Sequence, residues 1–154
     1  MVNRKNWLGM LVMVLVFGMT LVGCLSLFSR KKAPNSFQTG SGGETTILLR
    51  QGLDFDQAFR EVLFILSRHG FEPEMMQSDA GYIRTRWNTT WYNYQDNSRE
   101  RYRVRILINF NPSRTQLIVN APAEYSAQGE TWVVGYDTRA IETLRTDLTQ
   151  SIGN

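Results

Sequence analysis

The sequence predicts one two-layer α+β domain over residues 44–154, in which an antiparallel sheet of four or five strands carries two helices on one face. Two segments place apolar residues at helical spacing, and the segments between them alternate apolar and polar residues, as half-buried strands do. The predicted order is β-α-β-β-β-β-α, with room for one more short strand near Trp132. Both helices are expected on the apolar face of the sheet, because neither can bury its apolar stripe alone.

The first strand and helix have clear boundaries. Residues 44–52 carry β-forming side chains and end at a glycine, which predicts a short strand. Asp54 is a good N-cap, and Gln57 three residues later is typical of a capping box. The apolar stripe of this helix is Phe55, Ala58, Phe59, Val62, Leu63 and Leu66. Gly70 stands where a left-handed residue ends a helix, and Phe71 is expected to fold back onto the last turn.

The middle of the chain predicts a meander of strands. Residues 72–91 contain a turn at Ser78–Gly81, followed by strict alternation. One face is expected to hold Ile83, Thr85, Trp87, Thr89 and Trp91, and the other Tyr82, Arg84, Arg86, Asn88 and Thr90. Residues 101–110 alternate again, with Tyr102, Val104, Ile106, Ile108 and Phe110 expected in the core. A further strand covers residues 115–125 and is weakened near its end by Pro122.

The C-terminal segment predicts the second helix. Asp137 or Thr138 is expected to cap it, and Gly153 to end it. Its apolar stripe is Ile141, Leu144, Leu148 and Ile152. The two helical stripes and the apolar strand faces together predict a single core.

Composition excludes several classes of function. The 154 residues carry a net charge of +3, too weak a bias to predict nucleic-acid binding. One cysteine excludes an internal disulfide framework, and one histidine removes most metal-site and Ser-His chemistry. No carboxylate pair, phosphate loop or nucleophile motif is present in the sequence. We therefore predict a protein that is not an enzyme and needs no metal or cofactor.

The N-terminus is predicted to be an export signal. Arg4 and Lys5 precede an apolar run from Trp7 to Val22, and Gly23 stands before the only cysteine, Cys24. The sequence Leu-Val-Gly-Cys resembles the lipobox of bacterial lipoproteins. The resemblance implies cleavage between Gly23 and Cys24, and attachment of acyl chains at the cysteine. Residues 1–23 are then a signal peptide, and the mature chain is anchored to a membrane through Cys24.

An uncleaved membrane helix is the alternative, because residues 7–28 approach the ~20 residues that a span requires. Both readings place residues 30–154 outside the inner membrane, facing the periplasm or the cell surface. Residues 24–43 are rich in Ser, Gly and Asn and predict a flexible linker. Its basic triplet at 30–32 either touches anionic headgroups or is solvated. Leu25 and Ser26 lack an acidic retention signal, which favours the outer membrane.

The folded part resembles a known family. "GYIRTRW" leads into "RERYRVRILINF". A strand that contains a threonine comes next, and a tryptophan precedes the last helix. This order is similar to the helix-grip domain of BamC-type lipoproteins, accessory subunits of the machinery that inserts β-barrels into the outer membrane. In size and build alone, the chain also resembles LptE-type lipoproteins. The BamC-type resemblance covers residues 45–152 and implies a helix-grip fold and a partner in the cell envelope.

Arginine placement marks the candidate binding surface. The residues that we expect to share the sheet face away from the helices are Arg84, Arg86, Arg101, Arg103 and Arg105, with Arg99 in the same series. Guanidinium groups suit carboxylates and phosphates, so this face is predicted to dock an acidic protein surface or lipid phosphates. The alternative is a solvated face neutralised by Glu100, Glu124 and Asp96. Trp132 is either an exposed anchor for a partner or part of the core.

Three functions follow from these patterns. The first is a non-catalytic interaction module in the bacterial envelope, with a role accessory to outer-membrane protein assembly and another envelope protein as partner. The second is a carrier of lipid or of a small ligand, held between the helices and the sheet. The third, an enzyme, lacks a cluster of polar residues in the sequence. His69, in the last turn of the first helix, is expected to serve the helix end and to have no catalytic role.

Overall fold

The computed structural model describes residues 33–91, 100–127 and 131–154, and Ala33–Asn154 is one compact unit. The predicted signal peptide, Gly23, Cys24 and the first part of the linker lie outside these residues. The strands are β1 (Phe37–Thr39), β2 (Glu44–Leu48), β3 (Pro73–Gln77), β4 (Tyr82–Thr85), β5 (Asn88–Trp91), β6 (Arg101–Val104), β7 (Leu107–Phe110), β8 (Gln116–Asn120), β9 (Pro122–Ser126) and β10 (Val133–Asp137). The helices are α2 (Phe55–Arg68) and α3 (Thr138–Ile152).

The strands form two antiparallel five-stranded ladders, in the orders β1-β10-β9-β6-β5 and β2-β8-β7-β4-β3. Three passages of the chain run through both ladders, because β4 continues into β5, β6 into β7 and β8 into β9 after one or two residues. Backbone hydrogen bonds cross the junctions, from Thr85 N–H to the Ile106 carbonyl and from Arg105 N–H to the Pro122 carbonyl, each at 3.0 Å. The two ladders therefore meet end to end and form one layer.

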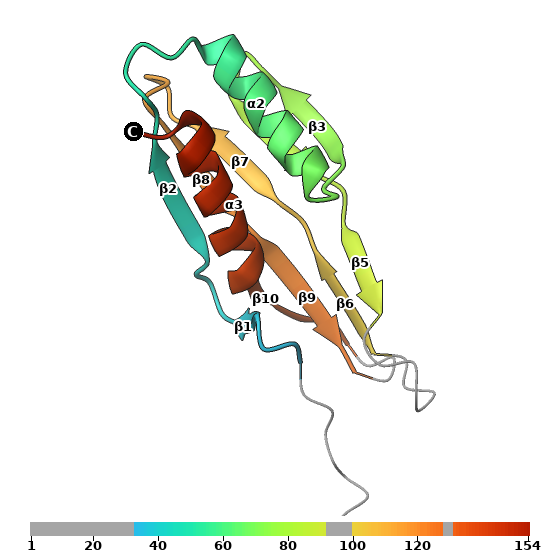
Figure 1. The fold of residues 1–154 in the computed structure, drawn as a ribbon. Helices are drawn as coiled ribbons and strands as arrows, with labels where there is room; N and C mark the ends of the chain where they lie inside the picture. Colours follow the sequence, from blue (N-terminus) through green and yellow to red (C-terminus); the bar gives the residue numbers. More distant parts are fainter. Residues whose placement is uncertain (1–32, 92–99, 128–130) are drawn as a thin grey trace, which may run out of the picture. The chain divides into compact units, whose positions relative to one another are not determined.

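Both helices lie on the same side of this layer (Figure 1). The predicted α+β fold class, with two layers and the helices on one face, is confirmed. The extra short strand placed near Trp132 is β10, which begins one residue later. The chain breaks each long strand into two, so the ladders contain more named strands than the predicted order.

The helix ends form as the sequence predicts. The Asp54 carboxylate accepts the Gln57 N–H at 3.0 Å. At the other end of α2, Gly70 has φ +75°, and the Phe71 N–H donates to the Leu66 carbonyl at 2.9 Å, the bond of a Schellman motif. Asp137 caps α3, because its Oδ1 accepts the Ala140 N–H at 2.7 Å.

The core lies between the helices and the sheet. The α3 stripe predicted from the sequence is fully buried. In α2 the buried residues are Ala58, Phe59, Val62, Ile65 and Leu66, so Ile65 belongs to the core although the predicted stripe omitted it. All five apolar residues predicted to point inward from the segment 101–110 are buried. This agreement fixes which side chains of β6 and β7 face away from the helices.

One boundary differs from the prediction. We expected residues 24–43 to be a flexible linker, but β1 lies within that segment and pairs with β10. Phe37 is 8% exposed and packs edge-on against Tyr102, with 5.9 Å between ring centroids. The prediction was wrong for this part, because an aromatic side chain and pairing with a distant strand outweigh the Ser- and Gly-rich composition around them.

Candidate functional site

The outward face of β6 carries the arginines that the sequence singled out. Arg103 and Arg105 are half-buried and Arg101 is exposed, whereas Tyr102 and Val104 between them are buried. The alternation predicted for this strand is therefore confirmed. Since the helices cover the buried side, the three arginines lie on the opposite face of the sheet.

Two tryptophans join these arginines in a stack, which we call the Trp–Arg cluster: Trp87, Arg103, Arg105 and Trp132. The Arg103 guanidinium lies 4.6 Å from the centroid of the Trp87 ring and 4.3 Å from that of Trp132. The Arg105 guanidinium also lies over the Trp87 ring, 4.5 Å from its centroid. Each such contact contributes ~0.5–1 kcal/mol at an exposed site and more where water is excluded.

An acidic residue completes the geometry around Arg103. Its Nε donates to Glu124 Oε2 at 2.7 Å, and its Nη2 donates to the same oxygen. The two side chains are 30% and 19% exposed, so the ion pair is largely screened from water. Arg103 is thus fixed along its edge by a carboxylate and on its faces by indole rings, which leaves it few alternative rotamers.

Trp87 reaches this face because of a β-bulge. Arg84 pairs with Leu107, but Asn88 pairs with Val104, so three residues of one strand oppose two of the other. An extra residue of this kind reverses which side chains point inward beyond it. We predicted Trp87 and Thr89 on the core face; Trp87 instead stacks on the arginines and Thr89 is exposed. The side chain of Trp91 lies outside the described residues.

The other predicted arginines are placed differently. Arg84 lies on the same face by register, but its Nε donates to Glu74 of β3 at 3.1 Å. Arg86 is exposed at the bulge, where its N–H donates to the Glu72 carbonyl at 2.8 Å. The expected row of equivalent arginines is therefore a smaller cluster at Arg103 and Arg105, in and just after β6, with Arg84 neutralised at its margin.

A second site lies on the helix side of the sheet. A pocket of about 330 Å³ opens between the end of α2, the start of α3 and β6. Its floor is apolar and includes Tyr102, Val104 and Leu144, which are 4%, 8% and 0% exposed. Its rim is polar and includes His69 and Arg139. No sequence motif marked it, because its residues come from segments far apart in the chain.

The carboxylate in the pocket wall, that of Asp137, already accepts three hydrogen bonds. Asp137 Oδ2 accepts the Ser36 hydroxyl at 2.9 Å and the Tyr102 hydroxyl at a shorter distance. Its Oδ1 accepts the Ala140 N–H that caps α3. Asp137 therefore links β6, the start of α3 and the residue that precedes β1, and has a structural reason for its burial.

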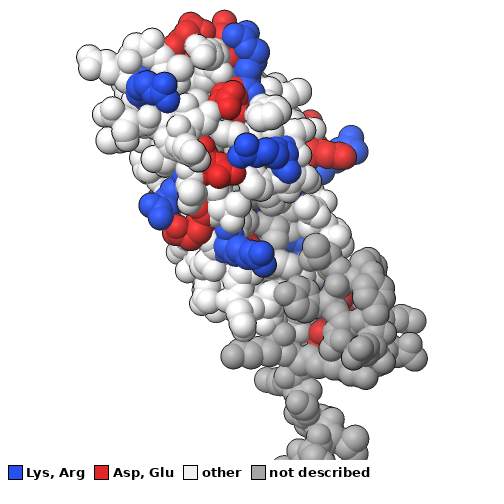
Figure 2. All heavy atoms as spheres, viewed as in Figure 1, with Lys and Arg blue, Asp and Glu red and all other residues white. Residues whose placement is uncertain are grey.

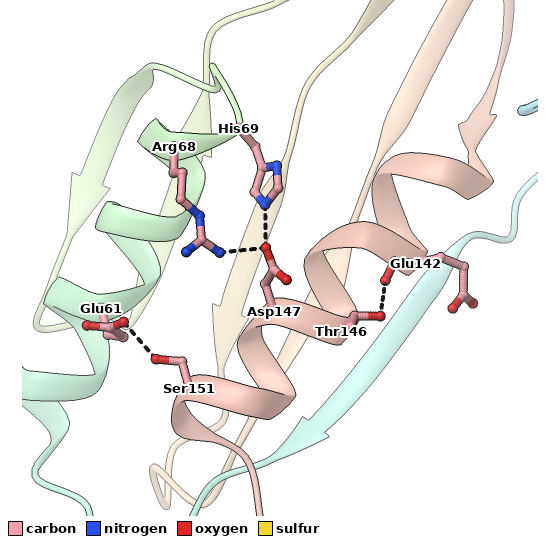
Figure 3. A network of polar contacts seen from close by, with 7 residues as sticks. All are labelled: Glu61, Arg68, His69, Glu142, Thr146, Asp147 and Ser151. Carbon is pink, nitrogen blue, oxygen red and sulfur yellow. Dashed lines mark hydrogen bonds and ion pairs between the residues drawn. The ribbon is translucent and has the colours of Figure 1, made fainter.

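Polar contacts hold the two helices side by side next to the pocket (Figure 3). Asp147 of α3 accepts from Arg68 Nη2 and lies against His69 Nε2, each at 2.6 Å. One turn further along, the Ser151 hydroxyl donates to Glu61 at 2.7 Å. The hydrogen bonds from His69 and then Arg68 lower the pKa of Asp147. His69, at the end of α2, thus contacts an acid on the neighbouring helix.

Charges on the helix-bearing face are mixed. Over the described part of this face, Figure 2 shows acidic and basic side chains interspersed, without a region of one sign. Within the described ranges, no group of three or more His, Cys, Asp and Glu residues is arranged to hold a metal ion. No helix in the described part of the chain is both long and apolar enough to span a membrane.

The sequence matches no protein-family model, and no curated protein matches it.

Proposed function

We propose that this chain is a lipid-anchored lipoprotein of the bacterial envelope, whose α+β domain is a non-catalytic module that binds another envelope protein. The observation that carries the proposal is the Trp–Arg cluster on the sheet face away from the helices. Tryptophan and arginine dominate the energetics of protein interfaces. Side chains that are already ordered lose less entropy when a partner binds.

The chemistry of the cluster defines the partner. Arg103 is neutralised by Glu124, but no ion pair of Arg105 is found among the described residues. Val134, opposite Glu124 on β10, is 65% exposed and adds apolar surface beside the stack. A surface that combines aromatic rings, an aliphatic side chain and a positive charge fits an acidic protein surface with apolar residues at its centre.

The anchor and its location rest on the sequence. The Leu-Val-Gly-Cys motif supports acylation of Cys24 and cleavage after Gly23, and the residues that follow favour the outer membrane. The BamC-type resemblance supports a role accessory to outer-membrane protein assembly. Labelling cells with a palmitate analogue is expected to mark the wild-type chain and not Cys24→Ser. An unlabelled wild-type chain would contradict the anchor and leave the binding surface to be tested separately.

Site-specific photocrosslinking in whole cells tests the interaction surface. A photoreactive residue at position 134 is expected to capture one protein reproducibly, because Val134 borders the cluster. Phe64 on α2 is the matched control site, since it is 61% exposed on the helix side. Arg105→Glu should abolish capture at position 134, whereas Arg145→Glu on α3 should not. Equal capture at both sites, or capture that survives Arg105→Glu, would contradict the proposal.

Ligand binding is the second candidate function, and the pocket between helices and sheet favours it. It is compatible with the first, because Tyr102 and Val104 face the pocket while Arg103 and Arg105 face the other way. Each site can therefore be altered without substitution of a residue of the other.

A further inference from the structure

The pocket beside α3 has the size and lining of a small-molecule site. Its volume of about 330 Å³ lies at the lower end of the ~300–1,000 Å³ typical of ligand pockets. That volume equals about eleven water-sized groups at ~30 Å³ each. An apolar floor with a few polar groups at the rim is the usual composition of such sites. The ligand is thus small and has an apolar part.

The charges around the pocket indicate which polar head group the ligand carries. Asp137 accepts three hydrogen bonds, and Asp147 is paired with Arg68 and His69. Asp147 is therefore paired with basic side chains, whereas the Asp137 carboxylate is bound by hydroxyl and backbone donors. Arg139 is exposed at the rim, and the structure shows no ion pair for it within the described residues. Arg139 is thus a cation on the pocket side for which the described residues provide no ion pair.

The N-terminus of α3 already holds an acid. Asp137 is the N-cap of the helix, and its carboxylate accepts the Ala140 N–H at 2.7 Å. The Arg139 side chain, in the first turn of α3, is therefore left to supply the positive charge at the rim. The floor below it includes Tyr102, Val104 and Leu144.

We propose that this pocket binds a small amphiphilic carboxylate, with its apolar body on the floor and its carboxylate paired with Arg139. A straight-chain acid of medium length fits the volume, since octanoate has about ten non-hydrogen atoms, close to the eleven estimated above. The carboxylate suits the guanidinium fork. This site does not depend on the Trp–Arg cluster or on its partner.

The test compares three ligands with the same chain and different heads: octanoate, octylamine and octanol. The full-length chain is embedded in phospholipid nanodiscs, with ¹³C-labelled methyl groups of Val104, Ala140 and Leu144 as NMR reporters. Octanoate is expected to shift these signals saturably, and the other two compounds much more weakly. Equal shifts from all three ligands, or none from octanoate, would overturn the proposal.

Two variants locate the interaction. Arg139→Gln should weaken octanoate binding about tenfold, which equals ~1.4 kcal/mol. Arg145→Gln on the same helix is the matched control and should bind octanoate normally, because Arg145 pairs with Glu142 outside the pocket. Ala140→Leu should fill the space and remove binding. Unchanged affinity in Arg139→Gln would refute the pairing, whatever Ala140→Leu does to the fold.

Discussion

The bulge that places Trp87 on the outer face is held by one buried hydroxyl, and its removal tests this part of the structure most directly. Thr85 is fully buried. Its Oγ1 accepts the Ile106 N–H at 2.8 Å and donates to the Arg86 carbonyl at 3.1 Å. The bulge takes away the backbone partner that the Ile106 N–H would otherwise have, and the threonine side chain replaces it.

Thr85→Val keeps the shape of the side chain and removes the hydroxyl. A buried N–H left without a partner costs ~1–3 kcal/mol. The methyl group that replaces the hydroxyl returns up to ~0.8 kcal/mol, so from the middle of that range we expect a net loss of about 1 kcal/mol. Thr46→Val on the exposed face of β2 is the matched control and should change stability by less than ~0.5 kcal/mol.

Urea unfolding of the full chain measures the loss, and amide hydrogen exchange identifies its cause. Ile106 is expected to lose protection in Thr85→Val and to keep it in Thr85→Ser, which retains the hydroxyl. Thr85→Ser loses the methyl group and keeps the hydroxyl, so it measures the methyl contact separately from the hydrogen bond. A valine variant as stable as the wild type, with Ile106 still protected, would refute our account of the bulge.

Three further predictions concern other contacts. A double-mutant cycle of Arg103→Met and Glu124→Gln should give a coupling of ~1 kcal/mol in urea unfolding, and zero coupling would mean that the pair does not order the cluster. Because the pKa of Asp147 is lowered on folding, its stabilising effect is present above the ordinary value of ~3.9 and is lost as pH falls below it. The difference in stability between wild type and Asp147→Asn should therefore shrink as the pH falls through the lowered pKa of Asp147, and a difference that stays the same at every pH would contradict this. Gly135→Ala would put a Cβ 2.1 Å from the Gln38 carbonyl oxygen, so β1 should detach and become sensitive to protease, and an unchanged digestion pattern would count against that pairing.

Local sequence signals predicted the helices well. Caps, apolar stripes and the Schellman glycine each depend on residues within a few positions of one another, as at Asp54 and Gly70. The alternation of residues 101–110 also held, because no extra residue interrupts β6 and β7. In such segments the side-chain pattern alone determines which residues are buried.

The bulge and β1 escaped prediction for a shared reason. Residues 82–91 alternate without interruption in the sequence, and only pairing with the neighbouring strand shows that an extra residue is present. Likewise, residues 37–39 form a strand because β10 offers an unpaired edge. Both features are set by a partner far away in the chain, so a window of local sequence carries no sign of them.

The candidate site was predicted in part for the same reason. Arg103, Arg105 and Trp132 were identified from their spacing and residue type, and the structure brings them together. Trp87 was assigned to the core, because the predicted alternation had no bulge. A ligand held between the helices and the sheet was one of the expected functions, but the residues of the pocket could not be predicted, since Arg139 and Val104 meet only when α3 packs beside β6.

One strand serves both proposed sites, and this determines how the two proposals can fail. Tyr102 and Val104 contribute to the pocket floor, while Arg103 and Arg105 belong to the cluster on the opposite face. The charged residues that we expect to contact the ligand and the partner protein are separate, however. Arg139 of α3 is on the pocket side, and Arg105 is on the opposite face of the sheet. Arg139→Gln should therefore reduce octanoate binding and leave crosslinking at position 134 intact, and Arg105→Glu should do the reverse. If either variant removed both properties, the sheet would be transmitting a change between its faces, and neither residue could be read as a direct contact.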